Sequence, residues 1–381
     1  MQSKVNQLLI QLQLQQITIQ YFSKKKQMIQ NKKYFNNLEE FLNSGFQEHQ
    51  VLNIDLKECD IGDKDASSLG SAIGNCTNLI DLTLGLYYNR IRDKGAQSLG
   101  LCIGKCTNLS NLVLGLSKNY IGDEGASGLS SGLGKCTNLS NFILGIRNEI
   151  GAIGVSSLVS GLGKCSNLSN LTIDLYRNQI GAIGASNLGS GLGECTNLQI
   201  LTLNLSNNKI GASGVLSLGS GLGKCTNLLN LQLDLRTNKI GNQGASDLGF
   251  GLGKCINLLN LKLCLVRNQI GPLGASRLGF GLGKSPNLQN LALNLYKNQI
   301  RDEGASDLGS GLGRCTSLSN LTLDITETKI CDKGASGLVY GLRKCANLSN
   351  LSLNIQRNYL ERVKCLKLKK LVTINIKYQW W

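Results

Sequence analysis

Histidine is almost absent from this sequence: its 381 residues include one, His49. A single histidine excludes a histidine-based catalytic triad within the repeats described below, and it excludes a histidine-rich metal site. No Cys-x-x-Cys pair and no His-Glu-x-x-His motif occurs. Protein-kinase signatures are missing too, since there is no His-Arg-Asp and no Asp-Phe-Gly. The sequence therefore predicts a protein that is not an enzyme and that uses no metal and no cofactor.

Proline is also rare, at 2 residues, whereas glycine is abundant, at 46. This composition matches neither collagen nor a proline-rich linker, and the 41% of hydrophobic residues suffices for a buried core. No run approaches the roughly 18 consecutive apolar residues of a transmembrane helix. Glutamines interrupt the apolar residues at the N-terminus, so a signal peptide is not indicated. We expect a cytoplasmic protein without membrane insertion, whose 14 cysteines stay reduced.

What the chain does have is a repeat of 30 residues, with one unit of 29. An asparagine recurs at this period, replaced once by threonine, at Asn89, Asn119, Asn148, Asn178, Asn208, Asn238, Asn268, Asn298, Thr328 and Asn358. A cysteine recurs with it, replaced once by serine, at Cys76, Cys106, Cys136, Cys165, Cys195, Cys225, Cys255, Ser285, Cys315 and Cys345. About ten copies of one unit predict a single solenoid rather than several independent domains.

Each repeat contains two shorter periods. In residues 167–195, Leu171 and Ile173 alternate with polar residues, which predicts a strand with one buried face. Leu188 and Leu192 follow at helical spacing. A strand and a helix in every repeat predict an α/β fold, a right-handed curved solenoid or horseshoe. Because helices are wider than strands, we expect parallel strands on the concave face and helices on the convex face.

The motif in this unit resembles a known repeat. The residues that match the core of a leucine-rich repeat are Ile173, Leu175, Asn178 and Ile180, and those that match the helical half of its ribonuclease-inhibitor-like subtype are Gly184, Leu188 and Leu192. The resemblance covers residues 51–360 and implies the same curved fold and a role in binding proteins. This chain departs from the pattern by an added Leu-x before the strand core, Leu171-Thr172. We therefore expect a longer strand.

Several positions have an expected structural role. The repeated asparagine can satisfy backbone groups in the turns of neighbouring repeats, so its replacement by Thr328 predicts a weak point. Aspartates before Gly-Ala suit helix N-caps, and alanine at the same place predicts helices that start less firmly. The aspartates are Asp93, Asp123, Asp302 and Asp332, and the alanines are Ala152, Ala182 and Ala212. The cysteines are expected to be small buried thiols at the helix ends.

The expected organisation has three parts. Residues 1–50 are a low-complexity segment, with weak order over residues 1–37 and a possible short cap helix after Asn37. Residues 51–360 are the solenoid, and the basic tail, residues 361–381, is expected to form a cap strand. Residues 144–151 lack one residue relative to the preceding unit, which predicts an irregular turn near Arg147 with Asn148 still in register.

Recognition is expected where the repeats differ, at exposed strand and turn positions. Leucines, asparagines and glycines are fixed by packing and turn geometry, whereas Tyr and Arg are frequent anchors of protein interfaces. The predicted partner-binding residues are Tyr87, Lys118, Arg147, Asp174, Tyr176, Arg177, Asp234, Arg236, Arg267, Tyr296, Lys297 and Asp324. The alternative is that these charged columns neutralise each other as exposed cross-strand pairs.

The function predicted from these features is a non-enzymatic scaffold for protein–protein interaction that uses the concave strand surface. The alternatives are a regulator of a small GTPase, or an interaction module related to the repeats of a larger kinase-containing protein. Charges of alternating sign at the exposed positions predict an acidic or mixed-charge protein partner, whereas the net charge of +16 suggests nucleic acid. A nucleic-acid partner is not favoured, because no continuous basic column occurs at the strand positions. We expect a monomer.

Overall fold

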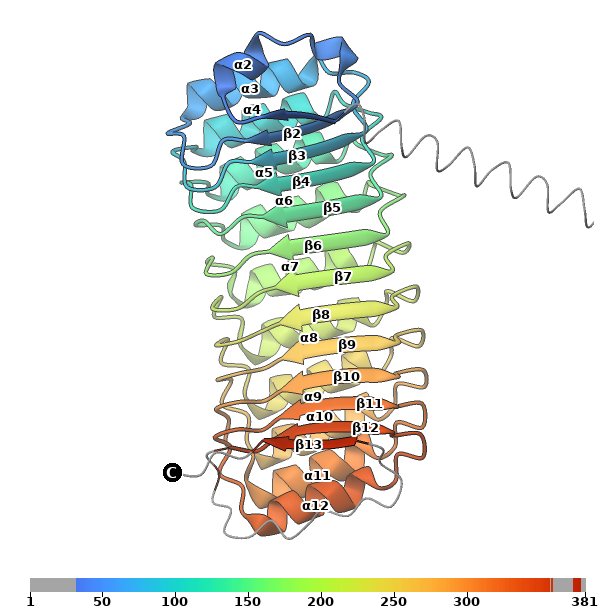
Figure 1. Ribbon diagram of the computed structural model, residues 1–381. Helices are drawn as coiled ribbons and strands as arrows, with labels where there is room; N and C mark the ends of the chain where they lie inside the picture. Colours follow the sequence, from blue (N-terminus) through green and yellow to red (C-terminus); the bar gives the residue numbers. More distant parts are fainter. Residues whose placement is uncertain (1–31, 357, 359–372, 378–381) are drawn as a thin grey trace, which may run out of the picture.

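The computed structural model describes residues 32–356, 358 and 373–377. They form one sheet of 13 strands in the order of the sequence, and every neighbouring pair is parallel (Figure 1). A helix follows each of the strands β2 to β11, so strands and helices form two layers. The predicted α/β solenoid is thus confirmed.

The elements recur with the period of the sequence. The strands are β1 (Lys32–Phe35), β2 (Val51–Asp55), β3 (Asp81–Gly85), β4 (Asn111–Gly115), β5 (Asn141–Gly145), β6 (Asn170–Asp174), β7 (Ile200–Asn204), β8 (Asn230–Asp234), β9 (Asn260–Cys264), β10 (Asn290–Asn294), β11 (Asn320–Asp324), β12 (Asn350–Asn354) and β13 (Thr373–Lys377). The helices are α2 (Leu38–Leu42), α3 (Asp63–Gly74), α4 (Asp93–Ile103), α5 (Asp123–Leu133), α6 (Ala152–Leu162), α7 (Gly181–Leu192), α8 (Gly211–Leu222), α9 (Gly241–Leu252), α10 (Pro272–Leu282), α11 (Arg301–Leu312) and α12 (Asp332–Leu342).

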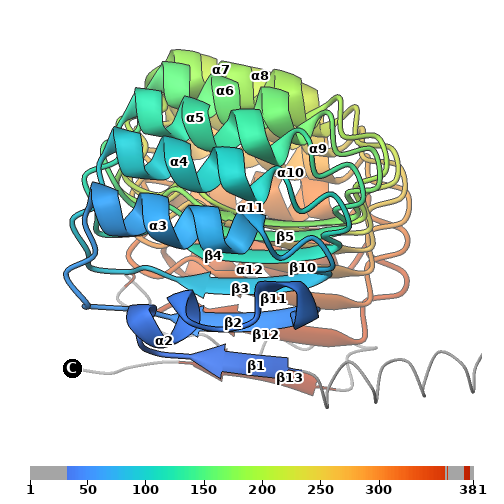
Figure 2. The same cartoon turned by 90° about the horizontal axis from the view of Figure 1, so that it is seen from above.

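The solenoid is curved. Figure 2 looks along the array, and in this view the helices of the middle repeats, α6 to α8, lie farthest from the strands β1 and β13 of the two ends. The sheet therefore faces the inner side of the curve and the helices form the outer side. Parallel pairing keeps equivalent residues opposite each other, as for Leu171 and Leu201.

The core runs through the whole array between the two layers. Leu171 and Ile173 point inward from β6, and Leu188 and Leu192 meet them from α7, all at most 1% exposed. Full burial of one such side chain stabilises the fold by about 1.5–3 kcal/mol. Each layer of core is closed by the next repeat, so one repeat cannot shield its own apolar face.

The added Leu-x predicted a longer strand, and this prediction is wrong. Each repeat strand spans five residues, for example Asn170–Asp174. Backbone pairing continues past the strand, because Leu175 N–H donates to Asn204 O at 2.9 Å and Arg177 N–H donates to Ser206 O at 3.0 Å. The extra residues therefore lengthen the contact between repeats without extending the regular strand.

The repeated asparagines form a ladder in the turns after the strands. Asn178 Nδ2 donates to Ile146 O at 2.9 Å and to Leu175 O at 3.1 Å, and its Oδ1 accepts from the N–H groups of Asn148 and Ile150 at 3.1 and 3.0 Å. These are buried backbone groups that would otherwise lack partners. The structural role expected for the asparagines is confirmed.

The short repeat keeps this ladder intact. Asn148 Oδ1 accepts from Asn119 N–H at 2.8 Å, and Asn148 Nδ2 donates to Leu116 O at 2.9 Å. Other repeats have a residue with positive φ just before the asparagine, such as Lys118 at 62° and Arg177 at 54°, but Arg147 is not among the positive-φ residues. The missing residue therefore removes the left-handed position and tightens the turn, as predicted near Arg147.

The aspartates at the helix starts do not cap their own helices, so the expected N-cap role was wrong. Asp93 is the first residue of α4, and its Oδ1 accepts from the N–H groups of Gly122 and Gly125, both at 2.8 Å, at the start of α5. Asp123 and Asp302 do the same for α6 and α12. Stacking offsets each helix start by one repeat, so the carboxylate reaches the free N–H groups of the next helix.

Where the capping aspartate is replaced by alanine, the backbone at the start of the next repeat's helix changes. Ala152, Ala182 and Ala212 cannot accept hydrogen bonds, and the glycines that open α7, α8 and α9 adopt φ values of 61°, 68° and 65°. Their N–H groups then donate to the backbone oxygen of the ladder asparagine, as Gly211 N–H does to Asn238 O at 2.9 Å. α6, which begins at Ala152, is itself capped by Asp123.

The N-terminal end differs from the expectation of weak order up to residue 37. β1 pairs with β2, placing Phe35 opposite Ile54, and Phe35 is 7% exposed. A short helix, α2, follows with Asn37 Oδ1 accepting from Glu40 N–H at 3.1 Å. The rings of Phe35 and Phe41 pack edge to face, with their centroids 5.3 Å apart. This segment therefore covers the open end of the core. Residues 1–31 lie outside the described residues.

At the other end, Thr373–Lys377 forms β13, parallel to β12 with Thr373 opposite Asn350. The rest of the expected C-terminal cap, including the basic residues Arg362 to Lys370, lies outside the described residues. The domain boundaries at residues 50 and 360 stay predictions.

The buried cysteines contact the last carbonyl group of the helix in the preceding repeat. Cys255 Sγ lies 3.3 Å from Leu222 O, the last carbonyl of the preceding helix, and Cys225 Sγ has the same relation to Leu192 O at 3.3 Å. Burial raises the pKa of Cys255 to about 12 and that of Cys225 to about 11. These thiols stay protonated and unreactive at neutral pH, as expected for structural cysteines.

Candidate binding surface

The inner face of the sheet presents three rows of side chains, because the first, third and fifth residues of each strand point away from the core. The first row is asparagine in eight strands, β4 to β6 and β8 to β12. The third-residue row varies, with Thr202, Gln232, Lys262 and Ala292 in successive strands. The fifth-residue row contains glycine in β3 to β5 and Asp, Asn or Cys in β6 to β12.

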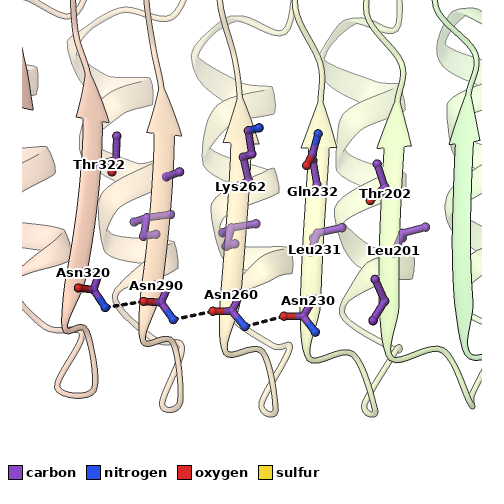
Figure 3. Close-up of a pocket in the computed structure, with 14 residues that line it drawn as sticks. Leu201, Thr202, Asn230, Leu231, Gln232, Asn260, Lys262, Asn290, Asn320 and Thr322 are labelled. Atoms are coloured by element: carbon purple, nitrogen blue, oxygen red, sulfur yellow. Dashed lines mark hydrogen bonds between the residues drawn. The ribbon is translucent and has the colours of Figure 1, made fainter. Parts of the chain in front are cut away.

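The asparagines of the first row form a second ladder, which the sequence analysis did not identify. Asn260 Nδ2 donates to Asn230 Oδ1 at 2.5 Å, and Asn290 Nδ2 donates to Asn260 Oδ1 at 2.5 Å (Figure 3). Ile200 interrupts the row in β7. A shallow groove of about 380 Å³ lies over β7 to β11 beside this ladder, lined by the asparagines and by Thr202, Gln232, Lys262 and Thr322.

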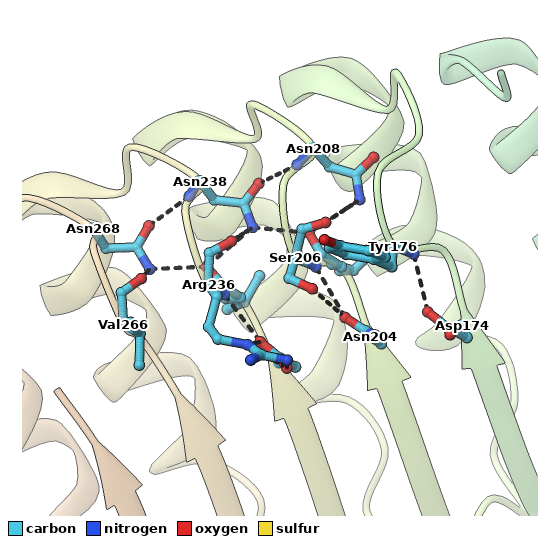
Figure 4. A network of polar contacts seen from close by, with 12 residues as sticks. Asp174, Tyr176, Asn204, Ser206, Asn208, Arg236, Asn238, Val266 and Asn268 are labelled. Carbon is cyan, nitrogen blue, oxygen red and sulfur yellow. Dashed lines mark hydrogen bonds and ion pairs between the residues drawn. The ribbon is translucent and has the colours of Figure 1, made fainter. Parts of the chain in front are cut away.

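The fifth row has a structural task that limits its role in recognition. Asp174 Oδ1 accepts from Tyr176 N–H at 3.0 Å, and Asp234 Oδ1 accepts from Arg236 N–H at 3.1 Å (Figure 4). Asp324 accepts from Thr326 N–H at 3.0 Å in the same way. The predicted site aspartates are therefore half-buried residues at the ends of their strands, each with one carboxylate oxygen accepting from a backbone N–H group.

Except at Arg147 of the short repeat, the described residue before each ladder asparagine is held in the left-handed region. Arg177, Arg267 and Lys297 have φ values of 54°, 55° and 55°, and Lys118 has 62°. Such a conformation is costly for a residue other than glycine. It points these basic side chains away from the turn, and Arg177, Arg267 and Lys118 are exposed.

Several basic side chains of the turns lie over tyrosine rings. The guanidinium of Arg147 lies 4.6 Å from the ring centroid of Tyr176, and that of Arg177 lies 5.2 Å from it. Lys297 Nζ lies 5.0 Å from the ring centroid of Tyr296. Tyr176 is half-buried rather than exposed, which corrects the expectation for this residue. The stacked pairs fix the position of the rings and present both aromatic and charged groups.

Five of the predicted residues line one hollow of about 560 Å³ at the turns after β6 to β10: Tyr176, Arg177, Arg236, Arg267 and Tyr296. Cys264 and Val266, which also line the hollow, are smaller than Asp234 and Arg236 at the same positions of the preceding repeat. Arg236 bonds to Asp234, with Nη2 2.6 Å and Nε 2.9 Å from Oδ2, and this pairing raises the pKa of Arg236. No ion pair of Arg177 or Arg267 occurs among the described residues.

The other predicted residues lie outside this hollow. Tyr87 is half-buried, and its ring fills the space that a side chain at Gly115 would need. Burial and the nearby Asp174 raise the pKa of Tyr87. Lys297 pairs with Glu327 at 3.4 Å, next to the hollow. The structure thus brings together the central part of the predicted surface and leaves Tyr87, Lys118 and Asp324 apart from it.

No group of three or more His, Cys, Asp or Glu side chains that could hold a metal ion occurs in the described part of the chain. None of the described helices is long and apolar enough to cross a membrane.

Comparison with known proteins adds the identity of the repeat. A family model described as "Leucine Rich repeat" matches residues 106–130, 195–219, 227–249 and 288–309. No curated protein matches the chain. Among solved structures, a chain from the "Crystal structure of Rad7 and Elc1 complex in yeast" aligns with 16% identity and a TM-score of 0.46, covering 90% of this chain and 80% of that chain. That likeness is too weak to carry an argument about function. The matched segments and the strand–helix period show that this protein is built from leucine-rich repeats.

Proposed function

We propose that this protein is a non-enzymatic scaffold that binds another protein on the inner strand surface and the adjacent turns. The observation that carries the proposal is the hollow at the turns after β6 to β10, where two arginines without ion-pair partners and two tyrosines converge. Tyr and Arg dominate the binding energy of protein interfaces. The ladders hold this surface rigid, so little conformational entropy is lost on binding.

The partner we propose is an acidic or mixed-charge protein, and the working form is a monomer in the cytoplasm. Arg177 and Arg267 supply positive charge in the hollow, while Asp174 and Asp234 supply negative charge beside them. Buried cysteines at the helix ends, such as Cys225 and Cys255, are free thiols, in keeping with a reducing compartment. We further propose that the repeats are about ten units of the ribonuclease-inhibitor-like subtype, supported by the 30-residue unit with a full helix.

The test compares capture of proteins from the native cell extract by the wild-type chain and by a double variant, Arg177→Asn with Arg267→Asn. Asparagine is chosen because Asn207 occupies the same left-handed turn position with φ 59°. The matched control, Lys94→Asn with Lys333→Asn, removes two exposed charges from the helical side. A partner that is lost with the hollow variant and kept with the control supports the proposal. A partner lost only with the control shows that the outer face is the binding surface.

A further inference from the structure

A row of basic residues follows one edge of the solenoid, separate from the surface described above. It has one position per repeat from α4 onward, two residues after the helix ends, as Lys254 follows Leu252 at the end of α9. We call it the basic rim: Lys105, Lys135, Lys164, Lys224, Lys254, Lys284, Arg314 and Lys344, all exposed, with Glu194 at the same position in one repeat.

The basic rim concentrates much of the charge of the chain. Eight basic residues and one acidic residue give 8 − 1 = +7, out of a net +16. The loops that carry these residues enter the strands at their start, and Figure 1 shows these loops side by side along one edge of the sheet. Five successive repeats, from Lys224 to Lys344, carry the charge without interruption.

None of the cations of the basic rim belongs to an ion pair among the described residues. A cation near a helix end can stabilise it by pairing with the last carbonyls. At the end of α8 the last carbonyl is already bonded, because Leu222 O accepts from Cys225 N–H at 3.0 Å and from Cys255 Sγ at 3.3 Å.

Exposed apolar side chains lie beside the uninterrupted half of the basic rim. Ile256, two residues after Lys254, is 51% exposed. Phe250 is also exposed, and Lys284 Nζ lies 4.8 Å from its ring centroid. The guanidinium of Arg314 lies 4.7 Å from the ring centroid of Phe280. Basic and apolar groups together on one edge are typical of surfaces that meet the headgroup region of a bilayer.

We propose that the basic rim docks on an anionic lipid bilayer. A row of loops along one edge suits a flat partner, and the aliphatic Ile256 can enter the interface between headgroups and acyl chains. Single-stranded nucleic acid is less well matched, because it needs open aromatic faces for base stacking. One face of each of the rings of Phe250 and Phe280 is covered by a cation. Docking by this edge leaves the inner strand surface free for a protein partner.

The test is co-sedimentation of the full chain with vesicles of phosphatidylcholine alone and of phosphatidylcholine with phosphatidylserine. We expect binding to the anionic vesicles alone, decreasing as salt screens the charges. The rim variant Lys254→Gln, Lys284→Gln and Arg314→Gln should bind about 100-fold more weakly, at about a factor of five per basic residue. Ile256→Ser should cause a further loss that added salt does not change.

The matched control is Lys209→Gln, Lys239→Gln and Lys329→Gln, three exposed lysines in the turns at the opposite edge. It changes the net charge equally and should leave vesicle binding within about twofold. Equal loss in both triple variants, or no loss in either, overturns the proposal. So does a chain that ignores anionic vesicles but binds single-stranded oligonucleotide through the same three residues. Thermal unfolding of each variant checks that the fold is unchanged.

Discussion

Pro272 sets the backbone conformation of Arg301 in the next repeat. Pro272 stands where Asn242 and Asp302 stand in neighbouring repeats, and those two side chains accept the N–H groups that open the following helix. Proline has no side-chain acceptor, and Arg301 instead adopts φ 56° with its N–H donating to Thr328 O at 3.0 Å. The same conformation is filled by glycine in three other repeats, as at Gly211.

This relationship predicts that Arg301→Gly stabilises the protein. A left-handed residue other than glycine costs roughly 1–2 kcal/mol, so removing the Cβ should raise the free energy of unfolding by about 1 kcal/mol. Chemical unfolding followed by circular dichroism measures the change. The reverse substitution, Gly211→Ala, is the control and should lower stability by a similar amount, since that glycine has φ 68° and open space around it. Equal stability of Arg301→Gly and wild type would contradict the argument.

Capping between repeats makes a second prediction, at Asp93. Asp93→Ala removes one acceptor from two N–H groups of the next helix and should cost about 1–2 kcal/mol. Asp93→Asn should cost much less, because Asn242 makes the same two bonds to Gly271 and Gly274. Hydrogen exchange locates the effect: faster exchange is expected at Gly122 and Gly125, in α5. Faster exchange at the start of α4 instead would restore the simple N-cap interpretation.

The sequence predicts the period, the core and the asparagine ladder because each depends on residue type at a fixed spacing. The capping between repeats could not be predicted in this way. Asp93 lies beside its own helix in the sequence, and the offset that carries its carboxylate to Gly122 exists only once the repeats stack. β1 was missed for a similar reason, since residues 32–35 show no repeat motif and become a strand by pairing with β2.

The binding surface could be predicted as a set of positions but not as a shape. The sequence identifies Tyr176, Arg177 and Arg267 by their variable, polar positions. The small side chains of Cys264 and Val266 line the hollow between them. In a single sequence, small residues do not indicate where a hollow will form. Aspartates such as Asp174 were assigned to recognition, because the turn that uses one carboxylate oxygen is not visible before folding.

Thr328 makes fewer hydrogen bonds than the asparagines that occupy its position in the other repeats of the ladder. Its Oγ1 donates to Ile325 O at 2.5 Å, but the side chain is too short to reach the preceding repeat as Asn298 reaches Leu265 O at 2.9 Å. Thr328→Asn should therefore add bonds to the preceding turn and stabilise the protein by about 1 kcal/mol. Asn268→Thr is the matched control and should destabilise it. If Thr328→Asn lowers the unfolding midpoint, the fully buried site does not accommodate the amide.

The cysteines predict a pH dependence of stability with a definite sign. Burial raises the pKa of Cys255 and Cys315 to about 12 from an ordinary value of 9.0. The folded state holds these protons more tightly than the unfolded state, so the stabilisation is complete below pH 9 and is lost as pH rises toward 12. Alkylation with peptide mapping at pH 8 should modify the exposed Cys59 and leave Cys255 and Cys315 unmodified. Rapid labelling of Cys255 in the folded protein would show that the helix ends open.

The last prediction concerns Cys264, which occupies the fifth strand position where Asp234 lies in the preceding repeat. Cys264→Asp should replace the weak sulfur acceptor for the N–H of Val266 with a carboxylate oxygen, as Asp234 provides for Arg236, and should stabilise the turn by about 1 kcal/mol. The same carboxylate would place a negative charge in the hollow beside Arg267 and offset the charge that we propose attracts an acidic partner. Stability and binding should therefore move in opposite directions, which a general defect in folding cannot produce. Cys264→Asn is the control, since it supplies the acceptor without the charge and should keep more of the binding. Unfolding by urea and the affinity for the captured partner measure the two effects, and tighter binding by Cys264→Asp would mean that the hollow receives a basic group.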